Sequence, residues 1–419
     1  MNNWKETTLD EIAYIIMGQS PSSESYNLDG DGLPFYQGVT EFGDKYLCVK
    51  NFTNSPTKVI DAGSILFSVR APVGRVNFTK NKCCIGRGNA GLMMKNGEQE
   101  FLYYLLKYLE KIILKNTTGT VFDSISGVEL RKFPVSVPES KNEQKQIASV
   151  LSSLDDKIEL LRKENETLEK IAQTIFKEWF VNFNFPDENG KPYKNAGGKM
   201  IDSELGEIPE GWRVGKLNEV VEFINGYAFK SSDLLGEEIG NCYKVFKMGN
   251  IKKGGGFDFS KTKSFVKKNK FKNLDKFILK KGDILMSMTD MKDAISLLGH
   301  TALMIYNDKY IVNQRVGLIR PLNDLNIGYP FLYLLTNDDV FIGDLRGRAN
   351  SGVQVNLSTD AIKNSKLVIA DKKTNNNFNE LSKPLFDKMR INELQIQILS
   401  RLCDTLLPRL MSGRIKILN

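Results

Sequence analysis

Residues 4–12 read WKETTLDEI, and residues 212–220 read WRVGKLNEV. Both stretches fit the pattern W-[KR]-x-x-x-L-[DN]-E-[IV], and each is followed at the same distance by a glycine, Gly18 in the first and Gly226 in the second. The chain therefore restates its own opening halfway along its 419 residues.

The parallel continues beyond the opening stretch. AGSILFSVR from Ala62 returns as KGDILMSMT from Lys281, and TGTVFDSIS from Thr118 returns, one residue shorter, as SGVQVNLS from Ser351. A repeat on this scale indicates duplication of a whole domain, because solenoids are built from much shorter units. The length also fits two to three domains that each bury a core.

A long amphipathic stretch follows the first copy. Ser140 and Glu143 predict a capping box at its start, and we expect a helix from about residue 141 to residue 183, roughly 60 Å long. Nine of ten positions at coiled-coil spacing are apolar, which predicts a packing seam. The ten positions are Ile147, Leu151, Leu154, Ile158, Leu161, Asn165, Leu168, Ala172, Ile175 and Trp179.

A second such stretch follows the second copy, from Phe378 to Leu410, with Pro384 expected in its first turn and Pro408 near its end. Because an isolated helix cannot bury such a stripe, we predict that the two helices bury their seams against each other in a rod. The second stripe, which is less regular, consists of Leu381, Leu385, Ile391, Leu394, Ile398, Leu402, Leu406 and Leu410.

The remaining sequence predicts an α+β fold with two tandem α/β domains. Short β-type runs such as ILFSV and KLVIA alternate with helical ones such as QEFLYYLLKYLEKIIL and GYPFLYLLTND. The segment between the halves is rich in proline, glycine and acidic residues, which predicts a connector without a packed core. The expected boundaries are a first domain at 1–138, a helix at 139–183, a linker at 184–210, a second domain at 211–372 and a helix at 373–415.

The composition is that of a globular chain with a basic excess. The formal net charge is +8, and nine lysines stand against one acid, Asp275, between Lys261 and Lys281. Such a cluster suits a polyanionic partner, and a lysine-rich solvated surface explains it equally well. The five cysteines show no metal-ligand spacing, and neither an export signal nor an apolar run of about 18 residues is present, so we expect a cytoplasmic chain with reduced thiols.

Motifs for catalysis are missing from the sequence. His300 is the only histidine, which excludes an HExxH zinc site and favours a structural role for this residue. The sequence has no GxxxxGK[ST] loop, no strand-linked GxGxxG, no Asn-Pro-Pro-aromatic tetrapeptide and no carboxylate cluster of the nuclease type. These absences together favour a binding protein with no cofactor or metal site of its own.

Arginine, glutamine and lysine residues instead occur at predicted turns. Arginine and glutamine read guanine and adenine edges bidentately, and arginine and lysine also hold phosphates. The alternative for each residue is a surface salt bridge or a hydrogen bond within its turn. The candidate DNA-binding residues are Arg70, Arg75, Arg87, Lys267, Lys268, Gln314, Arg315, Arg346, Arg348 and Gln354.

Several longer motifs follow one another along the chain: GLPFYQGVTEFG, SVRAPVGRV and CIGRGNAG, then SELGEIPEGW after the first long helix and LLPRLMSGRI at the end. Together they resemble the specificity (S) subunit of type I restriction–modification systems, in the family's order and over essentially the whole chain. Two features depart from symmetry between the halves. MSMTDMKD has no arginine where the first half has Arg70, and the lysine-rich segment has no counterpart in the first half.

The resemblance implies two target-recognition domains that each read one half of a split site in double-stranded DNA, held apart by two long antiparallel helices. It implies two methyltransferase (M) subunits docked on the helices, with restriction (R) subunits as further partners. S-adenosylmethionine, ATP and magnesium would belong to those partners. The departures imply different half-sites for the two domains. The expected partner-binding seam is Leu154, Ile158, Leu161, Leu168, Ile175, Leu394, Ile398 and Leu402.

We therefore expect a non-catalytic DNA-recognition subunit that does not contact a membrane. Two other hypotheses stay open from the sequence. The first is a self-contained DNA methyltransferase or nuclease with diverged motifs. The second is a coiled-coil scaffold that joins proteins without DNA specificity.

Overall fold

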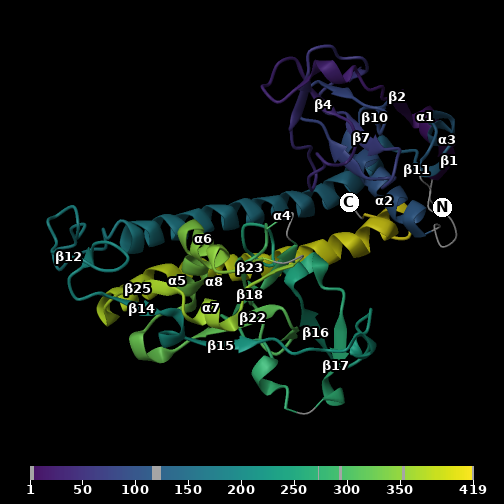
Figure 1. The fold of residues 1–419 in the computed structure, drawn as a ribbon. Helices are drawn as coiled ribbons and strands as arrows, with labels where there is room; N and C mark the ends of the chain where they lie inside the picture. The colour runs from purple at the N-terminus through teal and green to yellow at the C-terminus, as the bar shows by residue number, and fades with distance from the viewer. Residues whose placement is uncertain (1–3, 116–123, 272, 292–294, 352–353, 418–419) are drawn as a thin grey trace. The chain divides into compact units, whose positions relative to one another are not determined.

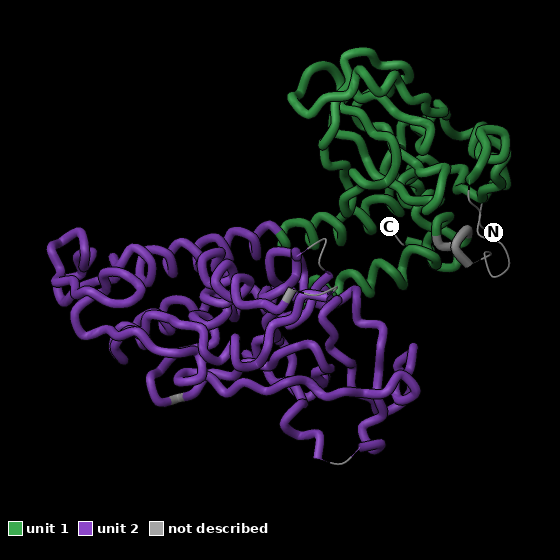
Figure 2. Tube along the Cα trace, in the orientation of Figure 1, with its two compact units in different colours: residues 1–162, 394–419 green, residues 163–393 purple. Residues whose placement is uncertain are grey.

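The computed structural model describes residues 4–115, 124–271, 273–291, 295–351 and 354–417. The chain divides into two compact units, Met1–Arg162 with Leu394–Asn419 and Lys163–Glu393, which Figure 2 colours separately. Two long helices, α4 (Lys141–Phe176) and α8 (Lys372–Met411), each contribute one part to each unit. Among the helices described, none is long and apolar enough to span a membrane.

The first unit contains a four-stranded antiparallel sheet, a mainly antiparallel five-stranded sheet and a strand pair (Figure 1). The four-stranded sheet has the order β2 (Ala13–Met17), β10 (Asn89–Met94), β7 (Ile65–Ser68), β8 (Val76–Phe78). The five-stranded sheet has the order β3 (Tyr26–Asn27), β5 (Asn51–Thr53), β4 (Leu33–Tyr36), β9 (Cys83–Ile85), β6 (Val59–Ile60). The unit also contains the pair β1 (Trp4–Thr8) and β11 (Pro134–Pro138) and the helices α1 (Leu9–Ile12), α2 (Gln99–Lys115) and α3 (Gly127–Arg131).

The second unit also contains a four-stranded antiparallel sheet, here accompanied by smaller sheets (Figure 1). The four-stranded sheet has the order β15 (Val221–Asn225), β22 (Val316–Pro321), β18 (Ile284–Ser287), β20 (Thr301–Leu303). The three-stranded sheets have the orders β17 (Phe265–Lys267), β16 (Cys242–Phe246), β21 (Tyr310–Val312) and β19 (Thr289–Met291), β24 (Gln354–Asn356), β23 (Asn350–Ser351). The strand pairs are β12 (Met200–Ile201) with β13 (Ile208–Pro209) and β14 (Arg213–Lys216) with β25 (Lys366–Ile369), and the helices are α5 (Tyr329–Thr336), α6 (Asp339–Gly347) and α7 (Thr359–Lys363).

The second unit repeats the topology of the first. The sheet β15-β22-β18-β20 matches β2-β10-β7-β8, the pair β14–β25 matches β1–β11, and the parallel pair β16–β21 matches β4–β9. Ser126 and Ser358, which occupy equivalent places in the repeated loop, each cap a short helix by accepting a hydrogen bond from the backbone N–H of Glu129 and Ala361. The predicted duplication of an α/β domain is therefore confirmed.

Helix α2 forms the centre of the core in the first unit. Its residues 101–106 are consecutive and each is at most 3% exposed, which explains why the run FLYYLL is apolar on every side. The helix packs on the four-stranded sheet, where Ile65 and Phe67 are also buried, and on Leu151 of α4. Burial of each large apolar side chain contributes about 1.5–3 kcal/mol to stability.

The segment predicted as a linker at 184–210 packs into the core of the second unit. Phe185 and Ile208 are buried, and the Phe185 ring lies 4.7 Å from the ring of Tyr193 and 4.8 Å from that of Trp212, centroid to centroid. The expectation of a connector without a packed core was wrong. Prolines and glycines do place turns there, but the aromatic residues between them are buried by Trp212 of the repeated opening motif.

Helices α4 and α8 pack antiparallel within each unit. In the first unit, Leu151 and Leu407 line one small pocket, and Ile158 of α4 clusters with Ile396 of α8. In the second unit, Asn392 Nδ2 donates to Asn165 Oδ1 at 2.9 Å and to Glu164 Oε2 at 3.1 Å. Further along the same pair, the rings of Phe176 and Phe378 lie 6.4 Å apart between centroids.

The packing stripe of α8 differs from the predicted one. Leu381, Ile391, Ile398 and Leu402 are 46, 52, 66 and 41% exposed, so they do not lie in a seam against α4. The buried residues of α8 are Thr374, Asn375, Phe378, Ser382, Phe386, Asn392, Ile396, Leu407, Leu410 and Met411. Four polar residues on the buried side and apolar residues on the exposed side hid this stripe from a count of apolar positions.

The ends of the long helices lie within a few residues of the expected bounds, 139–183 and 373–415. Helix α4 ends at Phe176 and continues as a π-helical turn, Lys177–Val181. Helix α8 begins at Lys372 because Asp371 accepts a hydrogen bond from the N–H of Thr374 at 3.0 Å and so caps the first turn. Pro384 therefore lies inside the helix and not in its first turn, and it has no N–H to donate to the carbonyl four residues earlier.

Candidate nucleic-acid interface

In the first unit, a tight turn between β9 and β10 presents Arg87. The end of β4, the end of β7 and the residues after β2 each hold the backbone of this turn through hydrogen bonds. The donor and acceptor residues are Gly18 to Asn89, Gln19 to Ile85, Gly86 to Tyr36 and Val69 to Gly88, all 2.9 Å between N and O. The Arg87 side chain is exposed.

The second unit repeats this turn between β21 and β22, with Gln314 in the place of Arg87. The same four bonds recur as Gly226 to Val316, Tyr227 to Val312, Asn313 to Phe246 and Met288 to Arg315, all 3.0 Å between N and O. Gln314 is exposed, and Arg315, at the place of Gly88, adopts φ 68°. Two different sequences, GRGN and NQRV, thus adopt one backbone arrangement.

Six of the candidate DNA-binding residues are exposed and make no side-chain hydrogen bond or ion pair with another residue that the structure describes. Their charged or amide groups are therefore available to a ligand. The six are Arg70, Arg87, Lys267, Gln314, Arg315 and Gln354.

Two further candidates contact a neighbouring side chain within their own unit. Arg75 lies 3.7 Å from Glu110 in an ion pair. The ammonium group of Lys268 lies 4.7 Å from the centre of the Tyr243 ring, in a cation–π contact. Both side chains remain partly accessible, so these contacts leave room for a phosphate.

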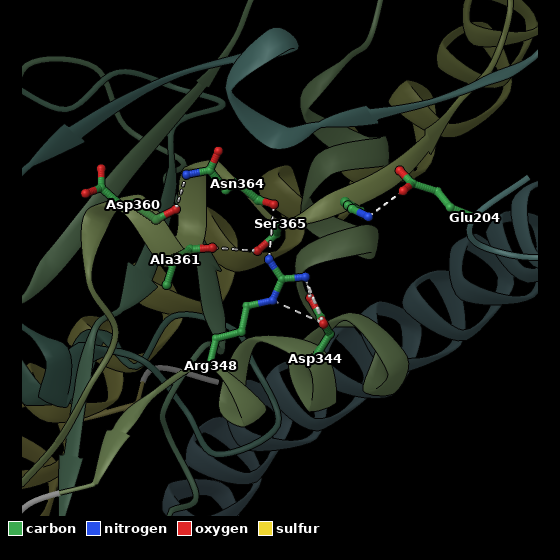
Figure 3. A network of polar contacts seen from close by, with 8 residues as sticks. Glu204, Asp344, Arg348, Asp360, Ala361, Asn364 and Ser365 are labelled. Carbon is green, nitrogen blue, oxygen red and sulfur yellow. Dashed lines mark hydrogen bonds and ion pairs between the residues drawn. The ribbon is translucent and has the colours of Figure 1, made fainter.

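Arg346 and Arg348 are held more firmly by the second unit. Arg346 Nε donates to the Leu298 carbonyl at 3.1 Å. Figure 3 shows Arg348 between Asp344, which accepts from Nη2 at 3.0 Å, and the Asn364 carbonyl, which accepts from Nη1 at 3.1 Å. These two arginines link α6 to its surroundings in the fold.

The lysine-rich segment of the second unit is largely exposed around β17. Lys270 pairs with Asp233 at 2.8 Å, and this hydrogen-bonded pair lowers the pKa of the Asp233 carboxyl. Lys281 pairs with Asp387 of α8 at 2.6 Å. Lys272 lies outside the described residues. Asp233 and Asp387 pair with only two lysines of the segment. The remaining described lysines outnumber these acids, so the surface of the segment stays positive.

Two exposed glutamines beside the first turn were missed from the sequence. Gln19 directly follows Gly18 and Gln37 follows β4, and the Gln37 backbone lies against the turn, 2.4 Å from where a Cβ on Gly88 would stand. For Gln19 the signal in the sequence was the repeated glycine, because the residue after Gly18 lies beside the turn. In the second unit, Tyr227 and Lys247 occupy the equivalent places.

The predicted partner-binding seam is split between buried and exposed positions. Ile158 and Leu161 are buried, and Leu154, Leu168, Ile175 and Leu394 are partly buried. Ile398 and Leu402 are exposed. Only the exposed and partly exposed members can meet another protein without rearrangement of the helix pair.

The described residues contain no cluster of three or more histidine, cysteine, aspartate or glutamate side chains that could hold a metal ion. The five cysteines are free. His300 is half-buried, and burial together with the charge of Arg346 lowers its pKa, which favours the neutral ring.

Both halves of the chain are similar to known proteins. The profile of a family described as the type I restriction modification DNA specificity domain matches residues 1–170 and again residues 209–399. The MjaIX specificity subunit, a type I restriction enzyme subunit of Methanocaldococcus jannaschii, is 26% identical over 452 residues, 99% of this chain and 94% of its own.

Two further relatives agree with the profile. A protein named for the type I restriction enzyme MjaX, from the same organism, is 44% identical over 177 residues, which is 41% of this chain and less than half, 41%, of its own length. The crystal structure of an S subunit of a type I restriction–modification system from M. genitalium is 18% identical and matches with a TM-score of 0.60. The match covers 98% of this chain and 96% of that one, so the two share a fold.

Proposed function

The chain belongs to the type I restriction modification DNA specificity family, and from this premise we propose that it reads a two-part target in duplex DNA, one half-site with each unit. As a specificity subunit it is the non-catalytic, DNA-recognising component of a restriction–modification system. The observation that carries the proposal is the duplication of one α/β domain within a single chain, in which a four-stranded sheet, a strand pair and a parallel strand pair recur.

The differences between the two units support different half-sites. Arg87 in one unit corresponds to Gln314 in the other, and the exposed lysines around Lys267 occur only in the second. The six exposed residues without side-chain partners are the proposed DNA contacts. In this proposal lysines contact phosphates, glutamines contact bases, and arginines contact either.

The long helices are proposed to set the distance between the half-sites and to carry the partners. A duplex offers equivalent faces about 34–36 Å apart, one helical turn. With both readers on one stiff support, the second contact becomes intramolecular and gains from a high effective concentration. The exposed apolar residues Ile391, Ile398 and Leu402 of α8 support docking of two methyltransferase subunits, with restriction subunits joining them. S-adenosylmethionine, ATP and magnesium are assigned to those partners.

Selection from a pool of randomised duplexes tests the proposal. The chain, purified together with its methyltransferase partner, should enrich two short sequences separated by a fixed gap of unspecified bases. Enrichment of one continuous site, or of none, would contradict the two-part target.

The two rival functions have separate tests. A self-contained methyltransferase would transfer label from S-adenosylmethionine to DNA when incubated without any partner, and we expect no transfer. A scaffold without DNA specificity would shift every duplex equally in a gel, and we expect a shift that depends on sequence when the methyltransferase partner is present.

A further inference from the structure

Gly18 and Gly226, the glycines that follow the repeated opening motif, lie against the two equivalent turns. A Cβ on Gly18 would stand 2.1 Å from the carbonyl oxygen of Gly86, and a Cβ on Gly226 would stand 2.0 Å from that of Asn313. Both distances are far below the 3.0 Å that real Cβ atoms keep. The clashing atoms belong to the backbone, which cannot rotate away as a side chain can. Only glycine therefore allows this approach.

The two carbonyls belong to the residues directly before Arg87 and Gln314. Each glycine also donates its N–H to the residue two positions after that side chain, Asn89 in one unit and Val316 in the other. The glycine thus contacts the turn on both sides of the residue it presents. Both halves have kept the glycine and its contacts, which hold the backbone of the turn in place. The side chain that the turn presents differs between the halves.

The exchange of arginine for glutamine separates two kinds of DNA contact. A position that binds phosphate needs a positive charge, because its affinity comes from displaced counterions, and glutamine has none. A position that reads a base needs two hydrogen-bonding atoms at fixed spacing. Arginine meets O6 and N7 of guanine in this way, and glutamine meets N6 and N7 of adenine. Arginine and glutamine are therefore equivalent for base reading and not for phosphate binding.

We propose that the two turns are base-reading turns, in which Arg87 reads a guanine in one half-site and Gln314 reads an adenine in the other. Gly18 and Gly226 are the positioning residues of these turns. The inference rests on the proposed function, since it names the bases that one residue of each unit selects. A fixed backbone suits this task, because less conformational freedom is lost when the side chain engages its base.

A residue exchange between the two turns tests the inference. Arg87→Gln and Gln314→Arg are each purified with the methyltransferase partner and carried through selection from randomised duplexes. We expect Arg87→Gln to change one position of one half-site from guanine to adenine, and Gln314→Arg to change one position of the other half-site from adenine to guanine. The preferred base should exceed the former one by about tenfold or more. Lys5→Gln on β1, which also removes one exposed positive charge, is the matched control and should leave both half-sites unchanged.

Two results would overturn the inference while leaving the proposed function intact. In the first, the Arg87→Gln complex keeps every base preference of the wild type. In the second, it binds all duplexes more weakly with unchanged preferences and with a salt slope lower by about 0.9, which is the behaviour of a phosphate contact. If the wild-type complex enriches no sequence, the proposed function fails and the inference fails with it.

The positioning role has its own readout. Gly18→Ala should weaken base preference at the position that Arg87→Gln alters and leave the other half-site unchanged. Gly226→Ala should do the same at the Gln314 position, so that each variant serves as the control for the other. Thermal unfolding shows which of the two variants are folded, and only folded variants are carried into duplex selection. A folded variant that keeps full base preference at its own position would contradict the positioning role.

Discussion

Asn392 offers a test of how the helix pair keeps its register. The side chain is fully buried between α8 and α4, where its Nδ2 donates to Asn165 at 2.9 Å and to Glu164 at 3.1 Å. Its Oδ1 is buried without a hydrogen-bond partner among the described residues. Two donated bonds contribute about 1 kcal/mol each, and an orphaned buried acceptor costs about 1–3 kcal/mol. The two effects nearly cancel.

We therefore predict that Asn392→Leu, which keeps the number and branching of the side-chain heavy atoms and removes the polar ones, changes the free energy of unfolding by less than about 1 kcal/mol. A buried asparagine instead serves to exclude other registers of a helix pair. One turn of slip is about 5.4 Å, or between one and two base pairs of DNA at 3.4 Å each. Selected duplexes should therefore show a broader range of gaps for Asn392→Leu than for the wild type.

Urea unfolding followed by circular dichroism measures the first effect, and duplex selection measures the second. Gln395→Leu, at an exposed position of the same helix, is the control for added apolar surface. The reasoning is refuted if Asn392→Leu loses more than about 2 kcal/mol, or if it selects a single gap as sharply as the wild type does.

Two more predictions concern charge. Burial raises the pKa of Glu169, which accepts a hydrogen bond from Tyr333 at 3.3 Å. The stability that a raised pKa confers is present below the ordinary pKa and is lost as pH rises through the raised value. On acidification, the free energy of unfolding of the wild type should therefore increase relative to that of Glu169→Gln, as measured by urea titrations. A constant difference between the two would contradict this. Lys267→Gln should weaken binding to every duplex alike and lower the slope of log affinity against log salt by about 0.9, and a change in base preference would show a base contact instead.

The duplication and the two long helices were predictable because each rests on a repeated local signal. The recurrence of a tryptophan, a leucine and a glycine at fixed spacing, with Gly18 and Gly226 at its end, marks two copies whose backbones share four hydrogen bonds around one turn. The apolar seam of α4 was readable because Ile158 and Leu161 repeat at helical spacing and are buried.

The packing stripe of α8 was not predictable from apolar spacing. Asn392 is buried and Ile398 is 66% exposed, because α4 offers polar partners on the inner side of the pair and an apolar surface is left outside. The candidate DNA contacts were only partly predictable for a similar reason. Whether Arg348 is free or held depends on Asp344 and on a carbonyl sixteen residues away, which no local pattern reveals.

The most direct test of a two-part reader on a fixed support is the gap itself. Removal of residues 159–165 from α4 together with residues 392–398 from α8 takes one heptad from each helix and keeps the flanking seam in phase. The pair shortens by about 10.5 Å, which corresponds to at most about three base pairs. Selection from randomised duplexes should return both wild-type half-sites with a smaller gap between them, spread over a broader range than in the wild type because the deletion also removes Asn392. Altered half-sites at an unchanged gap would contradict the account.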